Sequence, residues 1–265
     1  NVPHINQPEK FFIFEIGHHD ARGILAELDR EKRIRLVKRW EWRTPSTIAS
    51  LLRNRFQKLG WKDWSVIVSV DPILARTITL PLVLKRENEH RPLEATEIEN
   101  FLGTSVSAVF SEQRRHASRL LNVVDEADVV LIGSRVADFR SDGRRIINPL
   151  GLETKKLGIV VELTFTSRSL YEELRFLFSR RGGFFFTITP HAQLASLRPV
   201  SSSPITLVDL QPDFSLVFTL ATTTAGTSVA DSTLPWSADC FADLISAHWG
   251  VSQEVARRLY GMYLQ

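Results

Sequence analysis

The 265-residue chain contains a single cysteine, Cys240. One cysteine excludes an internal disulfide and any zinc site built from cysteines, and it suits a reducing compartment. The sequence also lacks a run of about 18 apolar residues that would cross a bilayer, and no secretory signal opens it. These absences predict a soluble, cytoplasmic protein that would contact a membrane, if at all, only at the membrane surface.

The chain has no excess of one charge and no long basic block. Its 33 basic residues are interleaved with 30 acidic ones, which leaves a formal net charge of +3. This balance argues against a dedicated nucleic-acid-binding protein. A hydrophobic content of 43% is ordinary for a globular protein, and the length fits one large or two ordinary domains.

Glycine is absent where a nucleotide-binding turn would need it. The stretch ITLVDLQPDFSLVFTL, residues 205–220, reads as a strand, a turn and a second strand. A backbone approaches a phosphate closely only where side chains are absent, yet the turn has none of the glycines that would allow this. Pro212 removes an N–H donor, and Asp213 adds negative charge. No P-loop or nucleophile-elbow motif appears elsewhere, so hydrolase chemistry other than ATP turnover has no support.

One order of elements occurs twice. The first copy is expected as three strands, a helix and a strand at residues 11–17, 21–29, 33–42, 44–60 and 65–70. Its helix would begin with Thr44 as N-cap and Pro45 at the first helical position, and end at Gly60.

The second copy is expected as strands at residues 205–210, 214–220 and 227–234, followed by a helix capped by Ser237. In each copy the first strand carries an acid at its end, Glu15 or Asp209. Two such units predict similar halves with a ligand between them.

A compact α+β insert is expected between the copies. Thr96 and Glu99 fit a capping box before a strongly amphipathic helix, and Asp142-Gly143 marks a hairpin. A strand at residues 157–165 and a helix capped by Ser167 follow. The run Phe184–Phe186 is expected to be a buried strand.

The last helix is expected to be part of the core. Its apolar residues Val255, Leu259, Met262 and Tyr263 share one helical face.

Three segments in this order resemble a known superfamily: NPLGLETKKLGIVVEL (148–163), ITPHAQLASL (188–197) and SQEVARRLYGMY (252–263). They resemble segments of the actin-like bacterial cell-division protein FtsA and of its relative PilM of type IV pili. The resemblance implies an α/β, actin-like (ribonuclease H-like) fold of two halves, with an SHS2-like α+β insert in the first half.

The resemblance also divides the chain into four parts. Residues 1–78 would form the first half with an N-terminal lead-in, and residues 79–183 the insert. Residues 184–200 would return to the first half, and residues 201–265 would begin the second. The chain ends before the family's adenosine-contacting region, so we expect either a fragment of a longer protein or a protein that lacks this region.

The nucleotide-binding positions implied by the resemblance are Glu15, Gly17 and Asp209. The family's hydroxyl residues and most of its glycines are replaced around them, including the glycine pair that aligns with Leu234–Ala238. We therefore expect no cofactor and weak or no ATP hydrolysis. In the alternative, ATP binds with magnesium held by the two acids Glu15 and Asp209. In the purely structural interpretation, backbone N–H groups or an arginine form hydrogen bonds with these two carboxylates. No metal site is expected at His18-His19.

Basic clusters in the expected insert provide a candidate partner-binding face. They comprise Arg114, Arg115, Arg119, Arg144 and Arg145. Such a face would suit an acidic peptide or a neighbouring subunit, whereas the bland interpretation is a solvated rim.

The leading hypothesis is an FtsA-like cell-division scaffold. The resemblance implies contact with FtsZ, self-association, and a peripheral position at the inner face of the plasma membrane through a tether outside the chain. The second hypothesis is a PilM-like pilus-assembly adaptor that binds a short peptide of a membrane partner. The third is an ATP-binding enzyme with unusual phosphate loops.

Overall fold

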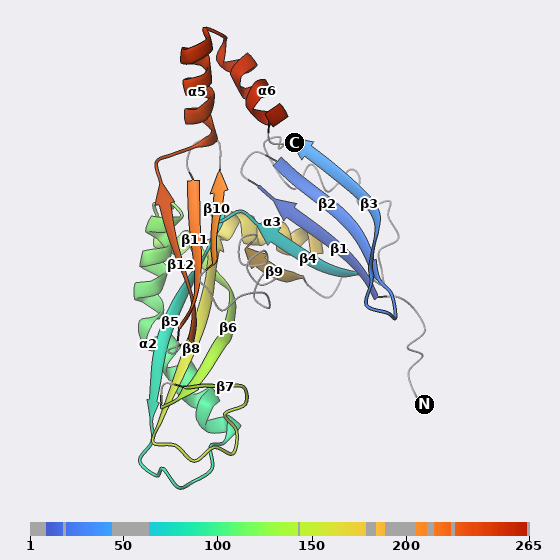
Figure 1. Cartoon of the computed structure of the whole chain (residues 1–265). Coiled ribbons are helices and arrows are strands. Elements are labelled where there is room, and N and C mark those ends of the chain that lie inside the picture. The colour runs from blue at the N-terminus through green and yellow to red at the C-terminus, as the bar shows by residue number, and fades with distance from the viewer. Residues whose placement is uncertain are drawn as a thin grey trace. The chain divides into compact units, whose positions relative to one another are not determined.

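The computed structural model describes residues 9–17, 20–43, 64–142, 144–178, 184–188, 205–210, 215–223 and 226–263. The chain divides into two compact units, Asn1–Ala192 and Gln193–Gln265, and each is described by itself (Figure 1). The helix expected at residues 44–60, the pair His18-His19 and the glycine-free turn at residues 211–214 lie outside the described residues.

A five-stranded sheet organises the first unit. Its strands are β1 (Glu9–Ile16), β2 (Asp20–Leu28), β3 (Ile34–Arg43), β4 (Ser65–Val70) and β9 (Phe185–Ile188). They lie in the order β3-β2-β1-β4-β9. The first three form an antiparallel meander, while β4 runs parallel to both β1 and β9. The predicted meander and the predicted strand at 65–70 are confirmed.

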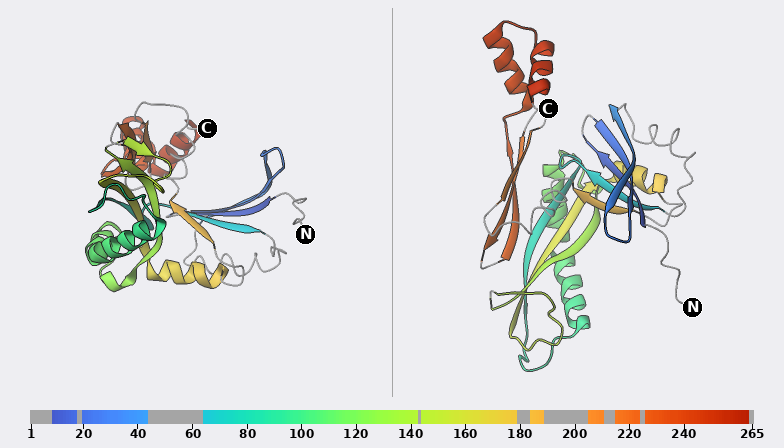
Figure 2. Two further views of the ribbon diagram at one scale, coloured as in Figure 1. Left: turned by 90° about the horizontal axis from the view of Figure 1, so that it is seen from below. Right: turned by 45° about the vertical axis from the view of Figure 1, so that its right-hand side comes forward.

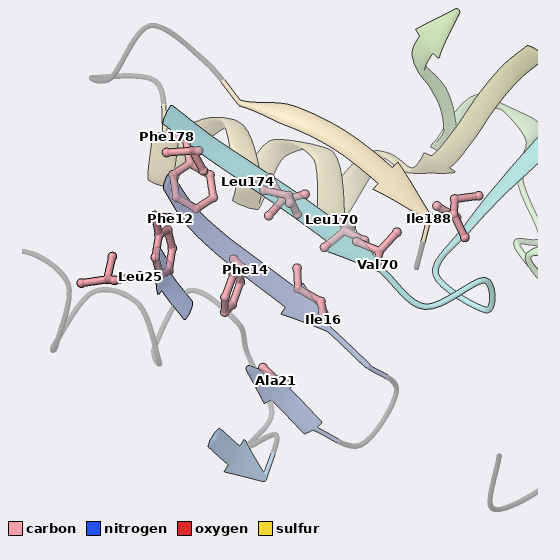
Figure 3. Packing of buried hydrophobic residues seen from close by; sticks show 13 residues of the cluster. Phe12, Phe14, Ile16, Ala21, Leu25, Val70, Leu170, Leu174, Phe178 and Ile188 are labelled. Carbon is pink, nitrogen blue, oxygen red and sulfur yellow. The ribbon is translucent and has the colours of Figure 1, made fainter. Parts of the chain in front are cut away.

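Helix α3 (Arg168–Phe178) covers one face of this sheet (Figure 3). Leu170, Leu174 and Phe178 lie four residues apart and are buried against alternate residues of the strands, among them Phe14. The predicted cap of the helix is confirmed, because the Leu170 N–H donates to Ser167 Oγ at 3.3 Å.

A second, four-stranded sheet forms what we call the insert. Its strands β5 (Ala75–Lys85), β8 (Lys156–Ser167), β6 (Val129–Ser141) and β7 (Arg144–Ile146) lie in that order. The expected hairpin between β6 and β7 and the expected strand at residues 157–165 are confirmed. The expected boundary at residue 79 falls inside β5, and the four-part domain division stays a prediction.

The long helix α2 (Ala95–Leu120) packs on the insert sheet, and the short η1 (Glu126–Asp128) leads from it into β6. The predicted apolar face is confirmed, with Ile98 buried and Phe101, Leu102, Val106 and Phe110 packed against the same cluster. The predicted capping box is wrong. The helix begins one residue before Thr96, so the N-cap is Glu94, whose side chain makes no capping hydrogen bond.

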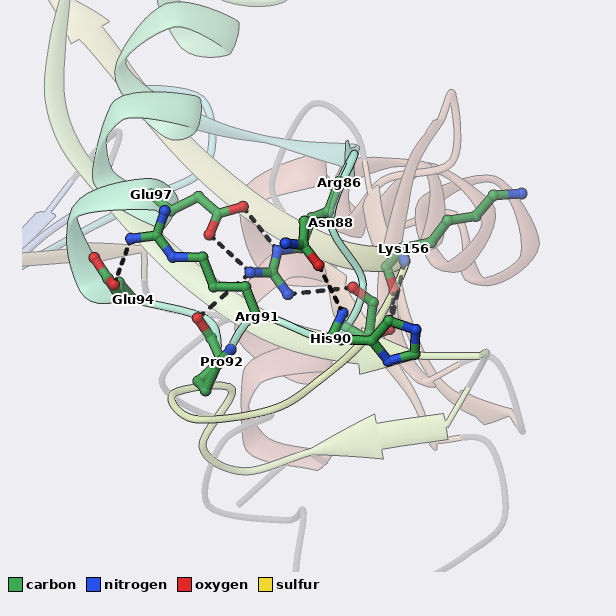
Figure 4. Close-up of polar contacts among 9 residues, drawn as sticks. Arg86, Asn88, His90, Arg91, Pro92, Glu94, Glu97 and Lys156 are labelled. Carbon is green, nitrogen blue, oxygen red and sulfur yellow. Dashed lines mark hydrogen bonds and ion pairs between the residues drawn. The ribbon is translucent and has the colours of Figure 1, made fainter.

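A buried arginine ties the start of α2 to the end of β5 (Figure 4). Arg86 is 2% exposed at its side chain and donates to both carboxylate oxygens of Glu97, at 2.8 and 3.1 Å. It also donates to the carbonyl oxygens of Pro92 and Thr154. A buried cation needs such partners, and here one guanidinium joins three segments of the insert.

The second unit contains an antiparallel sheet and two helices. The elements are β10 (Ile205–Leu210), β11 (Ser215–Thr223), β12 (Gly226–Leu234), α5 (Ala238–Trp249) and α6 (Gln253–Tyr263). The predicted meander and the cap at Ser237 are confirmed, since the Cys240 N–H donates to Ser237 Oγ at 3.2 Å. Gly250 ends α5 with φ 64°, a conformation that glycine adopts without strain.

Two predictions of buried faces are wrong in part. Phe184 and Phe186 pack against the core of the first unit, but Phe185 is 65% exposed, because successive residues of a strand face opposite sides. In α6, Val255 is 43% and Met262 73% exposed.

The face of α6 that packs is instead the one carrying Ala256 and Tyr260. Ala256 is fully buried, and the Tyr260 ring stacks on Phe241 of α5 at 5.7 Å between centroids.

Candidate functional site

The acid at the end of β1 has an arginine neighbour. Glu15 lies opposite Arg22 in the β1–β2 ladder, with Arg22 Nη1 3.6 Å from Glu15 Oε2. The same guanidinium lies 3.3 Å from Asp20 Oδ2 and 3.7 Å from Glu41 Oε1. The carboxylate of Glu15 therefore belongs to a cluster of one arginine and three acids, which is the bland interpretation of this residue.

Gly17 lies in a tight turn that explains the glycine without a ligand. Its N–H donates to the carbonyl oxygen of Asp20 at 2.8 Å. A Cβ atom at position 17 would lie 2.2 Å from Asp20 Oδ1, so any side chain there would displace that carboxylate. The space beside Gly17 is thus taken by a negatively charged group, which is unfavourable for a phosphate.

Asp209 lies on β10 of the second unit, half-buried and opposite Leu216 on β11. Glu15 and Gly17 belong to the first unit, whereas Asp209 belongs to the second. The nucleotide-binding role of these three residues, and a ligand between two similar halves, stay predictions.

Three of the five candidate arginines interact within the insert. Arg115 Nε donates to Glu126 Oε1 at 2.8 Å, and this hydrogen bond raises the pKa of Arg115. Arg145 Nε donates to the buried carboxylate of Asp138 at 2.9 Å, and the Arg114 guanidinium lies over the Phe110 ring at 5.8 Å.

Arg119 and Arg144 are exposed, and the five arginines do not share one surface. Arg114, Arg115 and Arg119 lie in the last turns of α2, near η1. Arg144 and Arg145 lie on β7, whose hairpin is level with the first residues of β8. This is the end of the sheet from which α2 starts, as Figure 1 shows. A helix of 26 residues is about 39 Å long, so the two groups are at opposite ends of the insert.

A groove of about 480 Å³ lies between the insert and the five-stranded sheet, within the first unit. Residues of β5, β6, β8, α3 and the segment 184–188 line it. Strand β9 is the end strand of the five-stranded sheet and pairs with β4 alone among the described strands. One wall of the groove is therefore a sheet edge.

The groove combines aromatic and cationic groups. Phe185 is 65% exposed, and Tyr171 and Arg175 reach the groove from α3. On the insert side, Arg135 Nη2 lies 2.6 Å from Glu162 Oε2, and the Glu162 side chain is only 6% exposed. Since Glu162 is already paired with Arg135, the exposed Arg175 leaves the groove with an excess of positive charge.

Sequence reasoning missed this groove because it is built from segments far apart in the chain. Thr77 and Thr187 both line it, although 110 residues separate them. The one available signal was the middle residue of the run Phe184–Phe186, which in a strand must face away from its two neighbours.

Within the described ranges, no group of three or more His, Cys, Asp or Glu residues is placed to hold a metal ion. In the same part of the chain, no helix is both long and apolar enough to cross a membrane.

No protein-family model and no curated protein matches the sequence. Solved structures do match. A chain of a PilM–PilN type IV pilus biogenesis complex is 14% identical with a TM-score of 0.53, over 96% of this chain and 69% of that one. A Bacteroides thetaiotaomicron protein with an actin-like ATPase fold and unknown function is 8% identical, with a TM-score of 0.45, over 92% and 78%. A nucleotide-free diol dehydratase-reactivating factor is 9% identical, with a TM-score of 0.40, over 93% and 76%.

The likeness to the first of these structures concerns the fold, and it agrees with the meander, parallel strands and insert described above. The predicted fold class is confirmed. The assignment to FtsA and the SHS2-like nature of the insert stay predictions. The chain has a mixed α/β fold similar to that of a chain of the PilM–PilN complex.

Proposed function

We propose that this protein is an adaptor that holds a segment of a partner protein in the groove between β9 and the insert. The observation that carries the proposal is the exposed Phe185 in a groove of about 480 Å³ with a cation beside it. A large aromatic ring that lies exposed in a groove is typical of a binding site.

The groove suits an extended chain. The edge of β9 offers main-chain groups for the addition of a strand, and the rings of Phe185 and Tyr171 offer contact for apolar side chains. Arg175 would attract a carboxylate of the bound segment. The PilM–PilN structure is itself a complex of two proteins, which supports a protein partner by analogy of fold.

The FtsA-like role, with FtsZ as partner and self-association, has less support. Its most specific motif, Asn148–Leu152, has a local structural explanation. Asn148 Oδ1 accepts from the Leu150 N–H at 3.0 Å, and the Gly151 N–H donates to the Leu93 carbonyl at 2.9 Å. Gly151 has φ 80°, which accounts for the glycine. The motif therefore serves the folding of the insert and does not distinguish between partners.

A photo-crosslinking experiment tests the groove. A photoreactive phenylalanine analogue replaces Phe185 in the full chain, and in a control it replaces Phe176 of α3, which is equally large and 66% exposed. We expect crosslinks to a pilus-assembly membrane protein from position 185 and none from position 176. Equal crosslinking from both positions would contradict the proposal that the groove is the binding site. A crosslink to FtsZ from position 185 alone would favour the division role.

We further propose that the adaptor works without nucleotide hydrolysis. The carboxylate of Asp20 beside Gly17 supports this, and so does the arginine beside Glu15. Calorimetric titration with ATP and magnesium tests it, with no binding expected at millimolar nucleotide. Micromolar binding that disappears in Asp209→Ala would instead establish the ATP-binding alternative.

A further inference from the structure

Strand β3 exposes three aliphatic side chains at the margin of the first unit. Ile34 is 77%, Leu36 59% and Val37 46% exposed. Ile34 and Leu36 are two residues apart and so share one face of the strand, about 7 Å from each other. The β2–β3 register shifts beside Val37, because Leu36 pairs with Ala26 and Lys38 with the preceding Leu25. This bulge leaves Val37 without a cross-strand partner.

The same hairpin is basic. Residues 29–39 contain six lysines and arginines but only two acids. Arg33 and Arg35 are paired with Asp29 and Glu27, at 3.0 and 2.5 Å. Lys32 and Lys38 are exposed at the turn and on the strand, and the Lys38 ammonium lies 4.9 Å from the centre of the Trp40 ring. Because Leu36 pairs with Ala26 and Lys38 with Leu25, Lys38 lies on the face of the edge strand opposite Ile34 and Leu36, while Lys32 lies at the turn.

We propose that the β2–β3 hairpin docks on an anionic lipid surface. The hairpin would approach the lipid with its edge, so that Ile34 and Leu36 enter the interface from one face of β3, while Lys32 at the turn and Lys38 on the other face meet the lipid phosphates. Apolar contact with the acyl boundary and attraction of cations to anionic headgroups reinforce each other in peripheral membrane binding. The charge complementarity of the hairpin selects this occupant.

A second copy of the chain fits the hairpin less well. β3 is the end strand of its sheet, and such an edge can pair with another edge. Pairing of two β3 strands would bring two basic strands together, and like charges opposite one another are destabilising. Cations on an edge strand can by themselves serve to prevent pairing with another strand. That function would not explain why three aliphatic residues are also exposed on β3.

The hairpin and the groove are at opposite edges of one sheet. The strand order β3-β2-β1-β4-β9 separates them by four strand spacings, about 19 Å. Figure 2 shows the blue β2–β3 turn on the side of the first unit that faces away from the insert. A lipid surface at β3 and a partner segment at β9 can be bound at the same time, and the inference about the hairpin does not depend on the groove.

Co-sedimentation with vesicles tests the inference on the full chain. The vesicles consist of phosphatidylcholine alone or of phosphatidylcholine mixed with phosphatidylglycerol. One variant carries Ile34→Thr and Leu36→Thr, which keep β-branched residues on an exposed strand. A second carries Lys32→Asn and Lys38→Thr, because asparagine tolerates the positive φ of residue 32.

Matched changes in the insert serve as controls. Val83→Thr replaces a 54% exposed strand residue of β5, and Lys155→Gln replaces an exposed lysine. Circular dichroism verifies that every variant is folded.

We expect the unmodified chain to sediment with the anionic vesicles, not with the neutral ones, and to be released by salt. Each hairpin variant should bind roughly tenfold more weakly, and the lysine variant should also lose most of the salt dependence. The control variants should bind like the unmodified chain. Unchanged binding by both hairpin variants would overturn the proposal, as would failure of the unmodified chain to bind anionic vesicles. A dimer in light scattering that Ile34→Thr with Leu36→Thr abolishes, without any vesicle binding, would identify a second copy as the occupant.

Discussion

At the scale of single residues, the turn after β1 shows how a neighbouring side chain can account for a glycine. The carboxylate oxygen Oδ1 of Asp20 lies 2.2 Å from where a Cβ of residue 17 would be. The sequence suggested that Gly17 contacts a phosphate. In the structure, the closeness of Asp20 already requires a residue without a side chain at this position. The glycine and the acid should consequently be coupled energetically.

A double-mutant cycle measures this coupling. Gly17→Ala should lower the free energy of unfolding by about 1 kcal/mol, because the new methyl group displaces the end of the Asp20 side chain. In an Asp20→Ala background the same change should cost clearly less, because only the contact with the carbonyl oxygen of residue 20 at 3.2 Å remains. Chemical denaturation of the four proteins gives the coupling, and additive effects would contradict this account of Gly17.

The turn between β2 and β3 should depend on pH through Asp29. Asp29 Oδ1 accepts from the Arg33 N–H at 2.8 Å, and this bond is the main cause of the lowered pKa of Asp29. Asp29 also accepts from the Glu31 N–H and from the Arg33 side chain. Because the folded pKa is depressed, the stabilisation is present above the unfolded pKa of about 4 and is lost as the pH falls through the folded value.

An NMR titration of the Asp29 carboxyl group tests this dependence. Its midpoint should lie below that of an aspartate in an unstructured peptide. In Arg33→Pro both the main N–H donor and the Arg33 side chain are absent, so the midpoint should move up towards the ordinary value. A midpoint that is the same in both proteins would show that these hydrogen bonds do not form in solution.

At the scale of elements, one arginine holds the insert's connection between β5 and α2. Arg86→Ala should lower the free energy of unfolding by about 2 kcal/mol, because it leaves two carbonyl groups and a carboxylate without their donor. This figure is below that for a fully buried pair, because the Glu97 side chain is 33% exposed and water partly replaces the guanidinium.

Arg91→Ala is the matched control for Arg86→Ala. Arg91 pairs with Glu94 at 2.6 Å in the same connection, but the two side chains are 61% and 55% exposed. Loss of such a surface pair should cost less than about 1 kcal/mol. Thermal denaturation compares the two variants, and equal losses would contradict the role given to burial.

At the scale of the whole molecule, the two units differ in how much core they contain. Both large apolar clusters lie within the first unit, one under the five-stranded sheet and one in the insert. Among the described residues of the second unit, the corresponding cluster has two buried members, Leu216 and Phe218, with Ile205 and Leu207 packed against them. The first unit should therefore fold independently.

A chain of residues 1–192 tests this expectation. It should unfold cooperatively with a Tm within about 5 °C of the main transition of the full chain, because its apolar clusters are intact. Circular dichroism and calorimetry follow the transition. A broad transition without a heat absorption peak would mean that the first unit needs the second for its own packing.

Local patterns in the sequence predicted most of the elements, because strand alternation, helix caps and hairpin turns depend on neighbouring residues. Ser167, Ser237 and the Asp142 hairpin are examples. The prediction failed at Thr96, because the helix begins at Ala95 and its N-cap is therefore Glu94, two residues before Thr96. The prediction of a buried face also failed at Val255 and Met262, which are exposed. An apolar helical face predicts which residues could be buried, but it does not predict which face another element packs against.

The sequence by itself determined that the glycines and hydroxyls of a phosphate-binding turn are missing, that the meander occurs twice and that an α+β insert separates the copies. Only the tertiary structure decided which charges face one another. It paired Glu15 with Arg22, separated the insert arginines into two groups, and brought α3, β9 and the insert together around one groove. Hydrogen-bond and apolar patterns act over a few residues, whereas a binding surface depends on distances between residues far apart in the chain.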